Sequence, residues 1–451
     1  MKSSNVVEIK KTILPNWLSY SNSGKAVINH VLLADEIASE VQIFKNNKHY
    51  KYFDENIGIW RDYAQQHLIT YMINKLGFDS SKSVITETLF QLENKFHKNN
   101  EFDPFEKSNP YLIAIKNGTY NLKTDEFKPI YDPKDYIQTK HDNIKFIPEA
   151  DCPQIERFLK SLVGEEHLDF IYEWFGFQLV RQYWPQCFLF LNGTGGAGKS
   201  KLIDLLTIFV GQQNVAGVSL DVLMNDAFAA SELYTKSSNL CADIEPKYMD
   251  KPGLLKNLTG DDLISANRKY LKPVQFKNYA KITFSMNSLP TLSDFSDGMR
   301  RRTIILPITK PIESNKQNAD IISEITSETE LAGLFNKAIQ GIKRIQQTKW
   351  FSVTPAITEA INNWFEESDI IQQFLNDECE FEKGNEALYT KAEDLFFSFD
   401  RYRADSKAKE ITKITFYKRL AIMGYIKKKK KLGKTSFQAI FGINHIQKNE
   451  W

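Results

Sequence analysis

The stretch Gly193-Thr194-Gly195-Gly196-Ala197-Gly198-Lys199-Ser200 decides how the fold of this chain is predicted. Residues 187–191, which precede it, read Cys-Phe-Leu-Phe-Leu and predict a short buried strand. Residues 201–209, which follow it, carry apolar side chains at helical spacing. A strand, a glycine loop and a helix in this order form a phosphate-binding loop, so the sequence predicts an α/β domain that binds a nucleotide.

The residue types in this loop suit a nucleoside triphosphate. Glycines let successive backbone N–H groups point at a phosphate, because no side chain blocks the approach. We expect the whole loop to bind ATP, with Lys199 reaching the β- and γ-phosphates and Ser200 holding Mg²⁺ through its hydroxyl group. A chance glycine turn is the alternative, and the flanking strand and helix count against it.

Hydrolysis of ATP also requires an acid for the metal and a group that orients the attacking water. Asp243 and Glu245 follow a short apolar strand about forty residues after the loop, and Asp243 is the first choice for the acid. Asn287 ends the apolar run 281–286, where it can hydrogen-bond the water. The alternative for the acid is that it only caps the turn that follows the strand. The alternative for Asn287 is that residues 287–290 form an ordinary turn.

A cluster of arginines follows at residues 300–302. Arg301 and Arg302 are candidates for the cation that neutralises charge on the transferred phosphoryl group, a role that a guanidinium from a neighbouring subunit often has. A solvated basic turn is the alternative, and without the glycine loop it would be preferred.

The composition is that of a folded protein. The chain has 451 residues, of which 42% are hydrophobic and 25% charged, which excludes a disordered protein and suits two to four domains at roughly 100 to 200 residues each. The four cysteines are far apart and predict neither a disulfide framework nor a metal knuckle. No apolar run approaches the roughly 18 residues of a membrane span. We therefore expect a cytoplasmic protein without a membrane partner.

Charge is distributed unevenly along the chain. Residues 401–451 hold fourteen Lys or Arg against three acids, a net charge of +11, although the whole chain has only +2. The first 400 residues are therefore net −9. A basic end on an acidic body indicates a module that binds a polyanion.

Four segments follow from these patterns. We expect a mixed α/β module at 1–150, the ATPase domain at 151–312, a helical connector at 313–364 and a basic domain at 365–451. In the basic domain, helical patterns near 370–375, 392–399 and 414–423 precede a lysine-rich hairpin, which is the outline of a winged helix.

Together these motifs resemble the superfamily 3 helicases of the AAA+ class, in particular the poxvirus, phage and plasmid primase-helicase branch. The resemblance covers residues 105–310 well, through the glycine loop and through segments 240–245, 255–262, 284–290 and 297–302. It implies an AAA+ P-loop core in a homohexameric ring that moves along DNA, with ATP bound between subunits.

The resemblance also implies two DNA contacts. A hairpin would carry a single strand in the central pore, through Arg268, Lys269, Tyr270 and Lys272. The C-terminal winged helix would bind duplex DNA of a replication origin, through Lys413, Lys418, Arg419, Lys427, Lys428, Lys429, Lys430 and Lys431. An ordinary exposed hairpin and a solubilising tail are the alternatives.

The sequence departs from this branch in two places. Ala242 stands where the branch often has the first of two acids, which leaves open whether Asp243 or Glu245 is the base. About 150 residues ahead of the ATPase domain are too few for a primase, so we expect no priming activity.

The leading hypothesis is a replicative helicase or initiator of a mobile genetic element, with a host or element primase or polymerase as a possible partner. An origin-binding protein that uses ATP only as an assembly switch is the second hypothesis. A small-molecule kinase is the third, and it leaves the arginine cluster and the basic tail unexplained.

Overall fold

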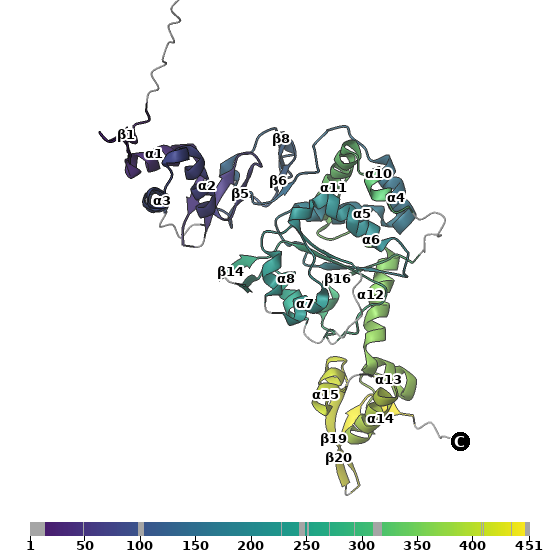
Figure 1. Cartoon of the computed structure of the whole chain (residues 1–451). Helices are drawn as coiled ribbons and strands as arrows, with labels where there is room; N and C mark the ends of the chain where they lie inside the picture. Colours follow the sequence, from purple (N-terminus) through teal and green to yellow (C-terminus); the bar gives the residue numbers. More distant parts are fainter. Residues whose placement is uncertain are drawn as a thin grey trace, which may run out of the picture.

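The computed structural model describes residues 14–446 apart from 48, 98–102, 227, 243–248, 250–251, 270, 293, 310–317, 407, 409 and 434. Figure 1 shows three groups of elements in succession: an N-terminal group of helices and short strands, a large central α/β body, and a C-terminal group. Helix α12 (Pro355–Ser368) leads from the central body to the C-terminal group. Within the described residues, no helix is long and apolar enough to cross a bilayer.

The N-terminal module, residues 14–97, is built on a small core of its own. Leu33 and Ile37 of α1 pack with Leu68 of α2 and Leu92 of α3, all of them fully buried. Strands β3, β4 and β5 form an antiparallel sheet beside these helices. The elements of the module are β1 (Leu18–Tyr20), β2 (Ala26–Ile28), α1 (His30–Glu40), β3 (Ile43–Lys45), β4 (Tyr50–Asp54), β5 (Ile59–Arg61), α2 (Ala64–Leu76) and α3 (Lys82–Phe96).

The central body is organised around a five-stranded parallel sheet with the strand order β11-β12-β15-β10-β16. Its strands are β10 (Phe188–Asn192), β11 (Val215–Ala216), β12 (Ser238–Cys241), β15 (Lys281–Met286) and β16 (Thr303–Pro307). Every residue of β15 is buried, as is usual for a parallel sheet covered on both faces. The predicted α/β class with a strand, loop and helix at residues 188–210 is therefore present in the structure.

Helices cover both faces of this sheet. They are α4 (Pro153–Val163), α5 (Leu168–Leu179), α6 (Lys199–Val210), α7 (Leu220–Asn225), α8 (Gly253–Leu258), α9 (Asp297–Arg300), α10 (Ile321–Ile325) and α11 (Glu328–Thr348). A hairpin of β13 (Leu263–Arg268) and β14 (Leu271–Lys277) is inserted between β12 and β15. Residues 263–268 alternate exposed and inward-facing side chains, the period-two pattern of a strand with one buried face.

Packing divides the chain differently from the predicted boundaries. The sheet β8-β7-β6-β9 at residues 112–141 shares one hydrophobic core with α4, α5, α6 and α11, so this core begins well before residue 151. Residues 313–364 were predicted to be a connector, but Leu334, Ala338 and Ile342 of α11 are fully or almost fully buried in that core. Helix α11 is therefore part of the hydrophobic core of the central body. The strands of this sheet are β6 (Leu112–Ile115), β7 (Gly118–Asn121), β8 (Glu126–Lys128) and β9 (Lys140–His141).

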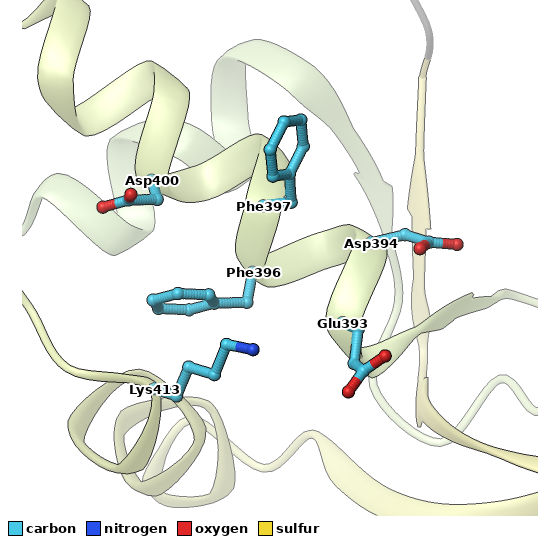
Figure 2. Close-up of a pocket in the computed structure, with 6 residues that line it drawn as sticks. All are labelled: Glu393, Asp394, Phe396, Phe397, Asp400 and Lys413. Carbon is cyan, nitrogen blue, oxygen red and sulfur yellow. The ribbon is translucent and has the colours of Figure 1, made fainter.

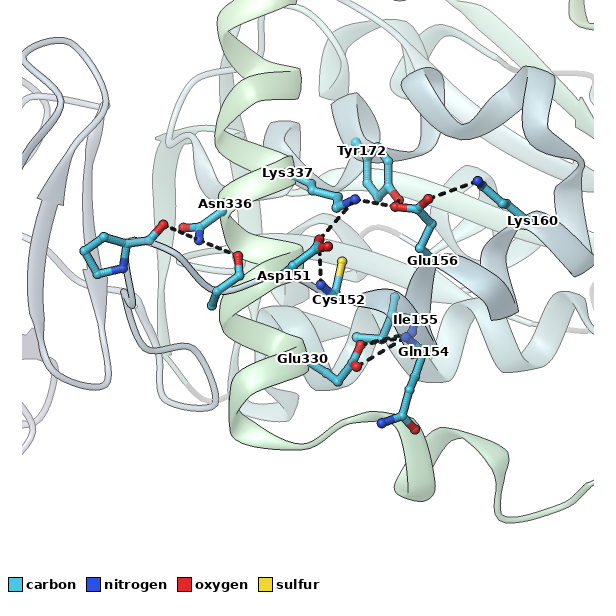
Figure 3. A network of polar contacts seen from close by, with 12 residues as sticks. Asp151, Cys152, Gln154, Ile155, Glu156, Lys160, Tyr172, Glu330, Asn336 and Lys337 are labelled. Carbon is cyan, nitrogen blue, oxygen red and sulfur yellow. Dashed lines mark hydrogen bonds and ion pairs between the residues drawn. The ribbon is translucent and has the colours of Figure 1, made fainter.

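Polar contacts join α11 to the start of α4 (Figure 3). The carboxylate of Glu330 accepts hydrogen bonds from the backbone N–H groups of Gln154 and Ile155, at 3.1 to 3.2 Å, and so caps the N-terminus of α4. Lys337 of α11 pairs with Asp151 and Glu156. A negative charge at a helix N-terminus is favourable, so these contacts fix α4 against α11.

The C-terminal group forms a third core around Phe374, Leu395, Phe399 and Phe416. Strands β18, β20 and β19 make a three-stranded antiparallel sheet, and β17 pairs with β21. The basic β19 and its partner β20 form the long hairpin at the tip of the group (Figure 1). The elements are α13 (Ile370–Glu378), β17 (Cys379–Phe381), β18 (Tyr389–Lys391), α14 (Ala392–Asp405), α15 (Lys413–Ile422), β19 (Ile426–Leu432), β20 (Thr435–Phe441) and β21 (Ile443–His445).

Candidate functional site

The glycine loop leaves the carboxyl end of β10 and enters the N-terminus of α6. Gly196 and Gly198 have φ angles of +75° and +84°, a left-handed conformation that side chains disfavour. Gly193 is required for a different reason, because a Cβ atom there would lie 1.8 Å from the carbonyl oxygen of Ile308 on the segment after β16. Three of the four glycines of the motif are therefore demanded by the backbone itself.

Lys199 lies at the centre of the loop, with its side chain almost fully buried. Its Nζ atom donates hydrogen bonds to the carbonyl oxygens of Gly193, at 2.7 Å, and Thr194, at 2.8 Å. A third bond, of 2.9 Å, reaches Oδ1 of Asn287. The ammonium group is thus held inside the curl of the loop.

The register of the sheet explains why Asn287 reaches this lysine. Strands β10 and β15 are parallel neighbours in which Asn192 lies opposite Met286, so Gly193 and Asn287 come next to each other. β10 also lies between β15 and β16, whereas the strand that follows β10 in sequence, β11, lies at the far edge of the sheet. Ligands of open α/β sheets bind at such a reversal of strand order, outside the carboxyl ends of the strands.

The loop fits the triphosphate of a nucleotide. Thr194, Gly195 and Gly196 are exposed, and so is Ser200 on the first turn of α6. The twelve-residue helix α6 directs its N-terminal N–H groups at the same place. Two buried polar atoms of the described residues near this site have no hydrogen-bond partner. They are Oδ1 of Asn192, which precedes Gly193, and Oγ of Ser285, two positions before Asn287. The backbone N–H groups at the start of α6 and the ammonium group of Lys199 therefore gather where a phosphate would lie.

Two acids that follow β12 are predicted to act with the loop. Asp243 and Glu245 lie outside the described residues. The strand that leads to them, β12, pairs with β15 in parallel, with Cys241 opposite Phe284. The carboxyl end of β12 therefore lies on the same side of the sheet as the glycine loop.

The three arginines at residues 300–302 differ in their surroundings. Arg300 donates to Oδ1 of Asn362 on α12 and packs over the ring of Phe365. Arg302 donates to the carbonyl oxygen of Gly298 and to Oε1 of Gln186. Arg301 is exposed, and no hydrogen bond or ion pair is recorded for it among the described residues. Arg301 is thus the arginine of this cluster that can reach another molecule.

The cluster lies at the amino ends of the strands, whereas the glycine loop of the same chain lies at their carboxyl ends. Thr303, which follows the arginines, pairs with Phe188 at the amino end of β10, whereas the loop begins beyond Asn192. Five strand residues at roughly 3.3 Å each separate the two ends by about 16 Å. Arg301 is therefore too far from the loop of its own chain to touch a phosphate bound there.

The predicted DNA-contacting hairpin is present as β13 and β14. Lys269 is exposed at its tip, and Arg268 lies 5.9 Å from the centre of the Tyr234 ring. Tyr270 lies outside the described residues, and of Lys272 only the backbone, in β14, is described. No local pattern points to Tyr234, because it belongs to no motif and Arg268, which lies over its ring, is 34 positions further along the chain.

The lysines of β19 line both faces of a protruding strand. Lys427 lies over the ring of Tyr417 at 3.8 Å, and Lys430 lies over that of Tyr389 at 3.2 Å. Lys428 forms an ion pair with Glu386. Lys429 and Lys431 are exposed without a recorded partner among the described residues, and so is Lys418 on α15. These three lysines are the most available cations of the predicted surface.

Two other predicted contacts face the protein itself. Arg419 forms an ion pair with the buried Asp369, at 2.5 Å, and lies 4.6 Å from the centre of the Phe295 ring of the central body. Figure 2 shows Lys413 directed at Phe396 of α14, in a hollow of about 380 Å³ whose rim also carries Glu393, Asp394 and Asp400. The charge of Arg419 is therefore paired with Asp369, whereas Lys413 is exposed and has three carboxylates around it.

The parallel sheet, with the glycine loop at the carboxyl end of its β10, is consistent with the core of a P-loop nucleoside triphosphatase. Sequence comparison narrows this class. Residues 31–164 match the family described as D5 N terminal like, and residues 191–302 match a family of unknown function, DUF5906. These two domains are typical of superfamily 3 primase-helicases, so the chain carries the domains of that group.

Individual relatives are distant. The chain is 29% identical over 249 residues to a protein of Acanthamoeba polyphaga mimivirus named "Putative helicase L207/L206", a match over 49% of this chain. The chain spans 25% of the length of that relative. Two apo structures of the NrS-1 C-terminal region have a similar fold over 92% of the chain, with TM-scores of 0.51 and 0.50. Their sequence identities are 15% and 14%, and 100% and 99% of those chains are covered.

Proposed function

We propose that this chain is an ATP-dependent DNA helicase that hydrolyses ATP at sites shared between neighbouring subunits. The observation that carries the proposal is the glycine loop, where Lys199 is buried and hydrogen-bonded to Asn287. In this proposal Lys199 binds the β- and γ-phosphates and Asn287 orients the attacking water. Ser200 and Asp243 would hold Mg²⁺, which would neutralise charge on the phosphates, and Glu245 is the second candidate for the acid.

The position of Arg301 supports a site shared between subunits. This exposed arginine is about 16 Å from the loop of its own chain, an estimate from the strand rise. In a head-to-tail ring, one face of each subunit meets the opposite face of the next, so Arg301 of one chain can complete the site of another. A homohexamer is the ring size that we propose.

DNA is the polymer that the basic surfaces suit. Lys269, at the exposed tip of the β13–β14 hairpin, and Arg268 beside it would contact a single strand in the centre of the ring. Helices α13, α14 and α15, with the β19–β20 hairpin, have the order of a winged helix, and we propose that they bind duplex DNA through Lys418, Lys429 and Lys431. Lysine contacts to phosphate give affinity without sequence information.

Replication of a mobile genetic element is the process that we propose for this helicase, in the cytoplasm and together with a primase or polymerase of the element or its host. The viral origin of the relative that matches half of the chain supports this assignment.

Strand displacement on a forked DNA tests the proposal. We expect the purified chain to displace a labelled strand with ATP, and Lys199→Ala to lose displacement and ATPase activity by about a hundredfold or more while it still binds DNA. Lys201→Ala is the matched control, because Lys201 lies on the same helix and bonds to the carbonyl oxygen of Ala319 instead of the loop. A discrete footprint on duplex DNA, with ATP binding but no displacement, would instead identify an origin-binding protein that uses ATP as a switch.

A further inference from the structure

Tyr234 lies beneath the β13–β14 hairpin and contacts three separate parts of the chain. Its ring meets the ring of Phe276 on β14 edge to face, with the centres 5.4 Å apart. Arg268 of β13 lies 5.9 Å from the centre of the same ring. The ammonium group of Lys51, which belongs to the N-terminal module, lies 5.6 Å from it. One aromatic ring is therefore within about 6 Å of a cation of the hairpin and of a cation of the N-terminal module.

Lys51 is an unusual residue for a strand of this module. It is in the middle of β4 and only 1% of it is exposed. Burial lowers the pKa of Lys51, the carboxylates of Asp62 and Asp103 oppose that shift, and the positive charge of Arg268 adds to it. An ammonium group is costly to bury unless charged or aromatic groups surround it. Here it forms an ion pair of 2.5 Å with Asp62 and lies between the rings of Phe105 and Tyr234.

The hairpin depends on such contacts for its position. A two-stranded hairpin is marginally stable by itself and takes its place from what packs against it. The face of β13 that carries Ile264 and Ala266 packs on the body, and Tyr234 packs against the same group of buried side chains. Figure 1 shows β14 at the edge of the central body below α2 and β5. The N-terminal module is therefore in contact with the base of the hairpin through Lys51 and Tyr234.

We propose that Lys51 and Tyr234 are positioning residues that hold the β13–β14 hairpin against the N-terminal module. They touch neither the nucleotide nor, in our proposal, the DNA. Because they set the position of Arg268, they determine how strongly DNA in the ring stimulates hydrolysis. The effect on the stimulation of hydrolysis by DNA rests on the proposed function, whereas the contact that holds the hairpin in position does not.

The variant Lys51→Met tests the holding directly. Methionine keeps the unbranched apolar stem and removes the charge, and Asp62, whose side chain is 40% exposed, can be hydrated without its partner. Lys45→Met is the matched control, because Lys45 also pairs with an acid, Glu93, and lies over a tyrosine ring, Tyr50, but belongs to β3 away from the hairpin. Tyr234→Leu removes the ring face and keeps an apolar side chain at this position.

Hydrogen exchange of the amides at residues 263–277 in the full chain is the first measurement. A lost cation–π contact predicts exchange that is about two to five times faster in Lys51→Met and in Tyr234→Leu, and unchanged exchange in Lys45→Met. Equal exchange in Lys51→Met and Lys45→Met would overturn the proposal. Faster exchange across the whole central body in Tyr234→Leu would show a folding defect, and Lys51→Met alone would then decide.

Stimulation of ATPase activity by single-stranded DNA is the second measurement. We expect basal hydrolysis by Lys51→Met to stay within about twofold of the unaltered chain and its stimulation by DNA to fall by a similar two- to fivefold factor. If the unaltered chain shows no stimulation, the proposed function fails while the exchange result still decides the holding. If the unaltered chain is stimulated and Lys51→Met is stimulated equally, the coupling role of Lys51 and Tyr234 fails while the proposed function stands.

Discussion

The Nζ atom of Lys199 donates a hydrogen bond of 2.9 Å to Oδ1 of Asn287, and this bond joins the glycine loop after β10 to the end of the neighbouring strand β15. The two residues are 88 positions apart in the chain. The side chain of Asn287 therefore keeps or loses this hydrogen bond according to whether Lys199 is bound to the loop carbonyl oxygens or to a phosphate.

Replacing Asn287 with alanine separates two roles. Lys199 keeps its bonds to Gly193 and Thr194, so we expect ATP binding to change little. The turnover number for ATP should fall by about ten- to a hundredfold, because the attacking water loses its orienting group, while KM changes by less than about threefold. Steady-state ATPase kinetics measure both, with the exposed neighbour Ser288→Ala as control. A raised KM with unchanged turnover would show that Asn287 only shapes the loop.

Replacing Lys429 and Lys431 with glutamine should weaken binding of duplex DNA without altering the fold. Both side chains are exposed on β19, and neither has a recorded partner among the described residues. Each lost phosphate contact should reduce the slope of log K against log salt by about one. Lys413→Gln is the control, because Lys413 faces the carboxylates of α14 (Figure 2). An unchanged salt slope in the double variant would place DNA elsewhere.

The contact between α5 and α11 should not tolerate a methyl group at Gly341. A Cβ atom there would lie 2.6 Å from the backbone nitrogen of Glu173 and 2.7 Å from the carbonyl oxygen of Tyr172. We expect Gly341→Ala to destabilise the chain by about 1 to 3 kcal/mol, as overpacking usually does. Gly253→Ala is the control, since a Cβ atom there meets nothing within 4 Å. Urea unfolding followed by circular dichroism compares the two, and equal midpoints would contradict the packing.

Acid should destabilise the chain through His141. Burial lowers the pKa of this imidazole to about 4 from its ordinary value of 6.5, although Nδ1 donates a hydrogen bond to the carbonyl oxygen of Val210. Below pH 6.5 the imidazole of His141 binds a proton in the unfolded chain but not in the folded chain. The contribution of His141 to the free energy of unfolding is therefore complete above pH 6.5 and is lost as the pH falls toward 4. The whole shift corresponds to about 3 kcal/mol.

His141→Asn tests this loss, because asparagine can keep a donor near Nδ1 but does not titrate. The urea midpoint of the variant should fall less steeply between pH 6.5 and pH 4 than that of the unaltered chain. His97→Asn, at an exposed histidine, is the control. Equal slopes for all three proteins would assign the acid sensitivity to other groups.

Local patterns predicted the nucleotide loop because its chemistry is written in consecutive residues. Residues 187–191 were expected as a strand and residues 201–209 as a helix, and the structure has β10 at residues 188–192 and α6 at residues 199–210. The hairpin of β13 and β14 was expected only from the resemblance to superfamily 3 helicases. The basic strand β19 with its partner β20 was likewise expected, because lysines and glycines mark it in the sequence.

Other features depend on contacts between distant segments, which no local pattern reveals. The sequence could not distinguish Arg301 from Arg300 and Arg302, because the partners Asn362 and Gln186 come from elsewhere in the chain. The ion pair of Arg419 with Asp369 likewise joins residues 50 positions apart. Tyr234 and Lys51 were missed for the same reason, since their meeting requires the N-terminal module to lie against the hairpin.

Mixing two inactive variants tests the shared nucleotide site most directly. Lys199→Ala and Arg301→Ala should each have little ATPase activity alone. When equal amounts assemble together on DNA, about a quarter of the interfaces pair an intact Lys199 with an intact Arg301 of the next chain, and activity should return to about that fraction. A mixture no more active than the average of the two variants would contradict a site completed by a neighbouring subunit.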